Sequence, residues 1–226
     1  MIKKTGIVVL LLLIFSVGTS VLSCAQDKQE APLDEYTKVI TGRADKIVDE
    51  IEFASEAEKT QVRDIIVEHY RFLNDAEDAR NEDVAKIREE FADNKELRDA
   101  KIDLRKAEQE LKVRDHHFAF YAQLKEIASE EQIDQVKDGL TYNVLNVTYV
   151  AMQEMVPSLT EEEKHQIYVW LLEAREHAID GGSSREKHGW FGKYKGRINN
   201  YLSARGYDLQ KERENWEKRL EEQKKN

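Results

Sequence analysis

The sequence is poor in the residues that interrupt secondary structure. It has two prolines and ten glycines among 226 residues, and neither type occurs between Gly42 and Gly139. A β-sandwich or barrel needs a turn about every ten residues, and such turns are rich in Gly and Pro. The scarcity therefore excludes both folds. We predict an all-α protein, in a chain long enough to bury a core.

Cysteine and positive charge are also scarce. Cys24 is the single cysteine, which excludes a disulfide within the chain. The chain has 35 Lys and Arg against 45 Asp and Glu, a net charge of −10. An acidic surface repels phosphate groups, so we expect no nucleic-acid partner.

The longest apolar run lies at the N-terminus and is typical of an export signal. Lys3 and Lys4 precede nine apolar residues, Ile7 to Phe15. Nine residues suit the core of a signal peptide and are too few to span a membrane. We therefore predict a signal peptide at residues 1–23 and an exported protein of the cell envelope.

The residues that follow this run resemble the lipobox of bacterial lipoproteins, Val21-Leu22-Ser23-Cys24. The resemblance implies cleavage before Cys24, lipidation of its thiol and anchoring in the outer membrane, on the periplasmic or the surface side. Residues 24–34 would then form a polar tether. The alternative is ordinary cleavage after Ala25, which would give a soluble periplasmic or secreted protein.

Two apolar patterns between residues 55 and 127 predict a long antiparallel, coiled-coil-like hairpin within a single all-helical domain, residues 35–226. The first stripe comprises Val62, Ile65, Ile66, His69, Leu73 and Ala76. The second alternates steps of three and four and comprises Leu97, Ala100, Leu104, Ala107, Leu111, Phe118 and Tyr121. The patterns lose phase at Asp93-Asn94, where we place the tip. The alternative is one continuous rod, and a homo-oligomer formed through the hairpin is a further expectation.

Other helices are indicated by their starts. Ser55, Ser129 and Thr160 each precede Glu or Gln by three residues, the pattern of a capping box. An uncharged crossover at 139–157 is expected to be buried, either as a helix or as irregular chain. Helices with a glycine seam at 160–208 and a terminal helix at 208–226 are expected to form a C-terminal helical bundle.

The adjacent histidines His116 and His117 raise the question of a metal site. Neighbouring residues on a helix point about 100° apart, which makes it hard for both to bind one ion. We therefore predict no metal site, and no cofactor.

The segment from Arg185 to Arg205 is unusual in charge and in glycine content. It carries six basic residues and one acid, a local balance of +5 in an acidic chain. We expect the basic residues either to pack on the chain's own acidic helices or to bind an acidic ligand. Small residues recur in it at steps of three and four: Gly189, Gly192, Gly196, Asn199, Ser203 and Gly206. Such a seam predicts a close helix crossing or, alternatively, close approach of a ligand.

These residues and the preceding helix supply the candidate site. Glu173, His177 and Asp180 share one helix face, and the following turn should bring them near Lys187 and His188. The candidates for acid or base catalysis are Glu173, His177, His188 and Tyr194. The candidates for ligand binding are Arg175, Lys187, Trp190, Lys193, Lys195, Arg197 and Asn200.

The C-terminal strings resemble a known family. Phe191-Gly192-Lys193-Tyr194-Lys195-Gly196-Arg197-Ile198-Asn199-Asn200-Tyr201-Leu202, together with Gly182-Ser183-Ser184 and Gly206-Tyr207-Asp208, look like the domain-of-unknown-function family 3826. The resemblance implies an exported protein of Gram-negative bacteria that live on polysaccharides, often encoded near glycan-degrading enzymes. It implies no catalytic residue.

Three functions follow as hypotheses. The first is a binding or accessory protein for acidic oligosaccharides in polysaccharide utilisation. The second is a glycan hydrolase or lyase that uses residues 173–201. The third is a structural or chaperone-like hairpin of the envelope. Whether the protein is an enzyme is left open by the sequence.

Overall fold

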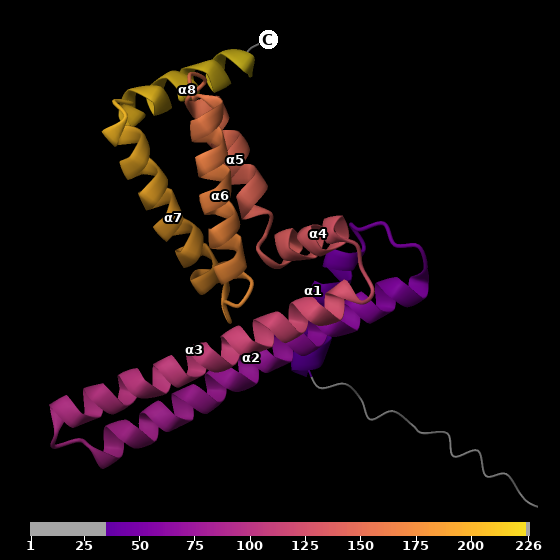
Figure 1. Cartoon of the computed structure of the whole chain (residues 1–226), viewed down its shortest axis with the longest axis vertical. Coiled ribbons are helices and arrows are strands. Elements are labelled where there is room, and N and C mark those ends of the chain that lie inside the picture. The colour runs from indigo at the N-terminus through magenta and orange to yellow at the C-terminus, as the bar shows by residue number, and fades with distance from the viewer. Residues whose placement is uncertain (1–34, 225–226) are drawn as a thin grey trace, which may run out of the picture. The chain divides into compact units, whose positions relative to one another are not determined.

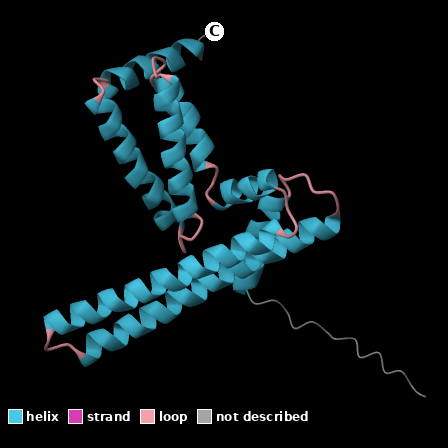
Figure 2. Cartoon of the chain, in the orientation of Figure 1, coloured by secondary structure: helices cyan, strands magenta, loops and turns pink. Residues whose placement is uncertain are grey.

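A computed structural model describes residues 35–224 and confirms the all-α prediction (Figure 1). Over these residues it contains only helices and loops, with no strand (Figure 2). The predicted signal peptide, the cleavage site and Cys24 lie outside the described residues. Among the described helices, none combines the length and the apolar character needed to cross a membrane.

The predicted hairpin is present, and the continuous rod is excluded. Helix α2 (Glu56–Glu90) and helix α3 (Lys95–Lys125) pack side by side along their length (Figure 1). Asn94 caps α3 by accepting a hydrogen bond from the amide of Leu97, so the tip lies where the two apolar patterns lose phase. Each helix spans ~50 Å at 1.5 Å per residue.

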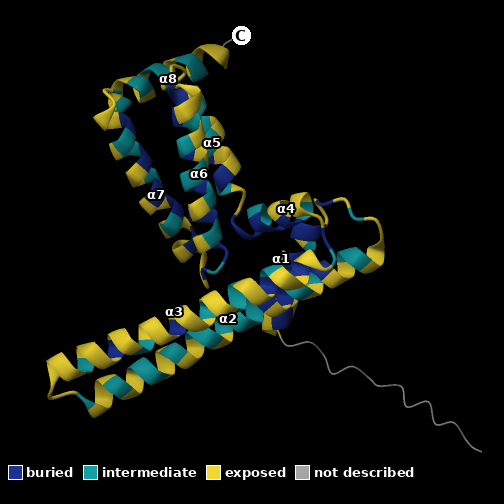
Figure 3. Ribbon diagram, in the orientation of Figure 1, coloured by how far each residue is buried: buried dark blue, intermediate teal, exposed yellow. Residues whose placement is uncertain are grey.

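The face by which α3 meets α2 differs from the prediction. The stripe on α2 is correct, with Val62, Ile66, His69 and Leu73 buried. On α3, however, the buried residues are Ile102, Gln109, Phe120 and Leu124. The predicted seam residues Leu97, Leu104, Leu111 and Phe118 are instead exposed. Figure 3 shows exposed residues along most of the length of α3. On the faces that meet, the two helices are joined by an Asp83–Arg105 ion pair of 2.7 Å and by stacked histidine and phenylalanine rings.

One core lies at the base of the hairpin. Helix α1 (Glu35–Val48) and helix α4 (Glu130–Leu140) pack there with the start of α2 and the end of α3. A Cβ atom at Gly139 would lie 2.7 Å from Ile47, so glycine lets α4 approach α1 closely. Helix α1 was not predicted, although its buried residues Ile40, Ala44, Ile47 and Val48 recur at the spacing of an amphipathic helix.

A second core joins the C-terminal helices. Helix α5 (Val144–Met155), helix α6 (Glu161–Ala178) and helix α7 (Ser184–Ala204) enclose it, and helix α8 (Leu209–Gln223) contacts α5 and α7. The crossover is therefore mainly α5, entered through Tyr142 and Asn143 with positive φ values of 58° and 56°. Its predicted burial is only half correct, because Leu145 is buried while Val147 is 62% exposed.

The caps follow the predicted sites, with one variation. Ser129 and Thr160 form complete capping boxes with Gln132 and Glu163. At Ser55 the hydroxyl accepts from the amide of Glu58, but that glutamate reaches one residue further and accepts from the amide of Ala54. Both arrangements pair amides that would otherwise lack partners at the helix start.

The predicted close helix crossing at the glycine seam is absent. Gly189, Gly192 and Gly196 lie on the exposed face of α7, and a Cβ atom at any of them would meet nothing within 4 Å. The large residues Phe191, Tyr194 and Ile198 fill the core from the opposite face instead.

Candidate functional site

A groove of about 1260 Å³ lies where the hairpin meets the start of α7. Its lining residues fall between positions 73 and 88 on α2, 106 and 118 on α3, 176 and 182 at the end of α6, and 186 and 193 on α7. The turn before α7 fits closely against the hairpin, since a Cβ atom at Gly182 would lie 2.7 Å from the Glu77 carboxylate. The groove is larger than the depression near the hairpin tip described below, and its lining combines aromatic, apolar and charged side chains.

Three predicted site residues meet in the wall formed by α6 and α7. The ring of Trp190 stacks on His177 with a centroid distance of 4.2 Å. The Nζ atom of Lys193 lies 4.8 Å from the centre of the Trp190 ring, a cation–π contact. Spacing explains the group, because Trp190 and Lys193 are one turn apart on α7 and His177 faces them from α6.

The opposite wall comes from the hairpin and was not predicted. Phe118, 62% exposed, and Leu111, 50% exposed, line it from α3 with the guanidinium of Arg114. On α2, Arg80 and Val84 complete this wall. These residues are separated from α7 by many positions in the sequence, and no local motif marks them.

The acidic side chains of the groove are mostly engaged. Their partners are Arg80 for Glu77, Lys137 for Glu176, His117 for Asp180 and the amide of Gly182 for Glu186. Glu110 is the exception among the described acids of the groove, with no cation in ion-pair distance.

The basic side chains show the opposite pattern. Arg88, Arg114 and Lys193 line the groove, and within residues 35–224 none of them has a carboxylate in ion-pair distance. Lys106 also lines the groove, but it pairs at 3.3 Å with Asp103, which lies outside the groove lining. The charge that the groove leaves unpaired is therefore mainly positive, although the chain as a whole is acidic.

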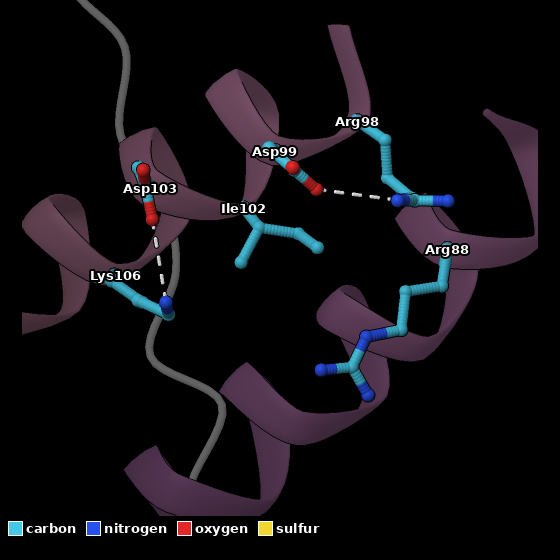
Figure 4. Close-up of a pocket in the computed structure, with 6 residues that line it drawn as sticks. All are labelled: Arg88, Arg98, Asp99, Ile102, Asp103 and Lys106. Carbon is cyan, nitrogen blue, oxygen red and sulfur yellow. Dashed lines mark hydrogen bonds and ion pairs between the residues drawn. The ribbon is translucent and has the colours of Figure 1, made fainter. Parts of the chain in front are cut away.

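A shallower depression of about 560 Å³ lies nearer the hairpin tip (Figure 4). Ile102 and five charged side chains line it, and Arg98 pairs with Asp99 as Lys106 does with Asp103 (Figure 4). It shares Arg88 and Lys106 with the groove. It offers no aromatic surface and only one apolar side chain, so we regard it as an extension of the groove rather than a separate site.

At the base of the groove, a histidine joins the hairpin to α6. Nδ1 of His117 lies 2.9 Å from a carboxylate oxygen of Asp180, and Nε2 lies 3.7 Å from Glu176. The hydrogen bond to Asp180 raises the pKa of His117 above its ordinary value of 6.5. The second oxygen of Asp180 is buried and has no hydrogen-bond partner within the described chain.

Behind this pair lies a buried polar junction. Nε2 of His69 donates to the carbonyl of Ile179 at 3.0 Å, so its Nδ1 accepts from His116 at 3.1 Å. Burial lowers the pKa of His69 to about 3, which keeps the ring neutral at physiological pH. Lys187 donates to the carbonyls of Leu140 and Ile179, and burial lowers its pKa to about 8.

Lys187 and Arg175, predicted to bind ligand, thus serve other contacts. Arg175 is 4% exposed and forms ion pairs with Asp134 and Asp138, which tie α6 to α4. Lys187 is 3% exposed and ties α7 to α4 and to the end of α6. Neither side chain lines the groove.

The remaining candidates lie elsewhere on α6 and α7. Glu173 pairs with Arg197 at 3.3 Å, and Arg197 lies over Trp170. Tyr194 is buried beside Glu173, and burial together with that carboxylate raises its pKa. His188 stacks on Tyr142 with centroids 5.5 Å apart. Lys195 is half-buried and Asn200 exposed, and neither lines the groove.

The expected convergence of Glu173, His177 and Asp180 on Lys187 and His188 therefore does not form one cavity. His177 and Asp180 line the groove, whereas Glu173 and His188 do not. Within residues 35–224, no group of three or more His, Cys, Asp or Glu side chains is arranged to hold a metal ion.

Fold and groove together define an all-helical protein with a long hairpin and a mixed aromatic and cationic groove. The chain belongs to the family described as protein of unknown function DUF3826, whose model matches residues 37–221. That range covers every helix from α2 to α7 and all of the groove. A comparison with curated proteins finds no match.

Proposed function

We propose that the protein is a binding protein of the cell envelope that holds a segment of an acidic oligosaccharide in the groove. The observation that carries the proposal is the charge of the groove. Its acids are mostly paired, whereas Arg88, Arg114 and Lys193 keep their charge available to a ligand. Guanidinium and ammonium groups bind carboxylates and sulfates by charge-assisted hydrogen bonds.

The size and the aromatic side chains of the groove support a saccharide. Sites for small ligands usually enclose about 300–1000 Å³, so a groove of about 1260 Å³ has room for several sugar rings. Phe118 on one wall and Trp190 on the other supply aromatic surface for the apolar faces of such rings. The bacterial context implied by the family resemblance agrees with this class of ligand.

The arrangement of the predicted acid and base residues favours binding over catalysis. A hydrolase or lyase needs its acid and base within reach of one bond. Glu173 and Tyr194 face Arg197 and the core, and His188 stacks on Tyr142, so these three do not share the groove with His177. We therefore place binding ahead of the hydrolase or lyase alternative.

The location we propose follows from the leader residues. Cleavage before Cys24 and lipidation of its thiol would anchor the protein in the outer membrane through the tether at 24–34. An anchored binding protein would hold glycan segments close to the enzymes that degrade them. Globomycin treatment of the producing cells tests this step, since it should cause the lipid-bearing precursor to accumulate, whereas ordinary cleavage after Ala25 would continue.

Calorimetric titration tests the binding. Uronate-containing and sulfated oligosaccharides should bind, and neutral oligosaccharides of the same length should bind much more weakly. Arg114→Gln and Lys193→Gln should each weaken binding by roughly tenfold. Lys112→Gln is the matched control, because this exposed cation lies on α3 outside the groove lining.

Two results would count against the proposal in different ways. Absence of heat and of thermal stabilisation with every acidic oligosaccharide would reject this ligand class. Binding that survives both groove substitutions unchanged would keep the ligand but move the site.

A further inference from the structure

Helix α3 carries a line of apolar side chains that no other described part of the chain covers. Leu97, Leu104, Leu111 and Phe118 are 41%, 61%, 50% and 62% exposed. They account for four of the ten exposed large hydrophobic side chains of the described residues. We call these four residues, with the exposed alanines Ala100 and Ala107 between them, the α3 stripe.

The α3 stripe has the spacing of a coiled-coil seam. Its large residues follow at intervals of seven, and its alanines lie three residues after Leu97 and Leu104. The opposite face of the helix, with Ile102 and Gln109, is already buried against α2. A seam that continues over ~30 Å of helix and points away from its own hairpin fits a further helix.

We propose that the occupant is the α3 stripe of a second copy, running antiparallel to the first. An antiparallel pairing in which positions 107 and 111 face each other sets Leu111 and Phe118 against small residues of the second copy, and sets Leu104 beside Arg114. Leu111 then meets Ala107 of the second copy, and Phe118 meets Ala100. Alternation of large and small side chains lets two helices approach closely and fill the interface.

The charges beside the stripe favour this orientation. In the antiparallel register, Lys101 of each copy lies opposite Asp115 of the other, and Asp103 lies near Arg114 and His117. A parallel pairing would instead set Asp103 against Glu108 and Glu110 against Asp115, which repel. The antiparallel dimer has one unfavourable feature. Near the twofold axis, Glu108 lies close to Glu108 of the second copy and Glu110 lies close to Glu110, so like charges repel.

The α3 stripe shares Ala107, Leu111 and Phe118 with the groove, so a dimer would compete with an oligosaccharide for that wall. The residues substituted in the test of the dimer all lie outside the groove lining. Sedimentation velocity of the purified protein over a wide concentration range should show a monomer–dimer equilibrium. Leu104→Lys should raise the dissociation constant by ~100-fold or more, because it would set a second cation against Arg114 of the second copy within the interface. Val147→Lys is the matched control: Val147 on α5 is 62% exposed and Leu104 is 61% exposed, so each change costs the monomer little.

Charge exchange tests the orientation. Lys101→Glu alone and Asp115→Lys alone should each weaken the dimer several-fold, and the double variant should restore it. In a parallel dimer Asp115 lies beside Glu110, so Asp115→Lys alone would strengthen association. Glu108→Gln should strengthen the antiparallel dimer by removing one repulsion at the twofold axis.

Several results would overturn the inference. A wild-type protein that remains monomeric at the highest attainable concentration would exclude self-association through the stripe. Dimers that tolerate Leu104→Lys, or that Val147→Lys weakens equally, would place the interface on another face. Strengthening by Asp115→Lys would reject the antiparallel orientation.

Discussion

His117 on α3 and Asp180 at the end of α6 form a hydrogen bond of 2.9 Å that joins the hairpin to the C-terminal helices beside the groove. Both side chains are largely buried, with 18% and 16% of their surfaces exposed. Because Asp180 favours the protonated ring, it raises the pKa of His117. A raised folded-state pKa means that the stability gained from this contact is fully present below pH 6.5 and is lost as the pH rises through the folded-state value.

The first prediction concerns the titration of this histidine. NMR titration of the ring protons should give His117 a pKa above 6.5. His116 should have a pKa below 6.5, because burial lowers it. Asp180→Asn should lower the pKa of His117 and weaken the stability gained at low pH. Asp99→Asn, which changes an exposed carboxylate near the hairpin tip, should leave the His117 titration unchanged. Equal pKa values for His117 in wild type and Asp180→Asn would contradict the assignment of the contact.

The second prediction concerns acid unfolding and His69. Burial holds the pKa of His69 at about 3 in the folded protein, against an ordinary value of 6.5. Between pH 6.5 and 3 the histidine is therefore protonated in the unfolded chain and neutral in the folded chain. The free energy of unfolding falls as the pH drops through this range. The full contribution is on the order of 5 kcal/mol. Urea unfolding across this range measures it.

Two variants separate this titration from other acid effects. His69→Leu should lower stability at neutral pH, because the hydrogen bond to Ile179 is lost, but should flatten the decline between pH 6.5 and 3. Ile66→Val, at a fully buried neighbouring position of α2, should cost about 1 kcal/mol at every pH. A decline of the same steepness in His69→Leu would show that other groups cause it.

The third prediction distinguishes a structural arginine from a ligand-binding one. Arg175→Met should cost about 3 kcal/mol of unfolding free energy, because it leaves the Asp138 carboxylate without a cation in a largely buried site. The exposed pair Arg197–Glu173 serves as the control, and Arg197→Met should cost less than about 1 kcal/mol. Oligosaccharide affinity should be unchanged in folded Arg175→Met, and a specific loss of affinity would restore the role predicted from sequence.

Arg175 also shows what the sequence could and could not predict. Local rules placed the hairpin tip at Asn94 and the caps at Ser129 and Thr160, because each depends on residues within one turn. The partners of Arg175 lie about forty positions away on α4, and no local pattern indicates them. The same holds for the groove. Trp190 and Lys193 were predicted from the sequence, whereas the residues of its α2 and α3 walls are brought to it only by the tertiary packing.

The α3 helix gives a more specific lesson. Its heptad pattern predicted correctly that the helix has an apolar seam, but not which neighbour the seam meets. A helix with two usable faces can satisfy its hairpin partner with Ile102, Gln109 and an Arg105 ion pair, and keep the apolar seam outward. Periodicity predicts that the seam exists, but only the tertiary packing shows what contacts it.

The fourth prediction concerns the exposed glycines of α7. Glycine in a helix interior costs about 0.5–1 kcal/mol relative to alanine, because the unfolded chain is more flexible. Gly192 and Gly196 have open space around the position of a Cβ atom. Gly192→Ala and Gly196→Ala should therefore each stabilise the protein by about that amount, measured by urea unfolding or as a rise in Tm.

Gly139 supplies the opposite case, which makes the fourth prediction a test of geometry rather than of composition. A Cβ atom there would lie 2.7 Å from Cγ2 of Ile47, a branched side chain held in the core between α4 and α1. Gly139→Ala should destabilise the protein by about 1–3 kcal/mol through overpacking. If Gly192→Ala or Gly196→Ala destabilises the purified protein as Gly139→Ala does, then α7 packs closely against another surface in solution, such as a second copy, and its glycine face is not open.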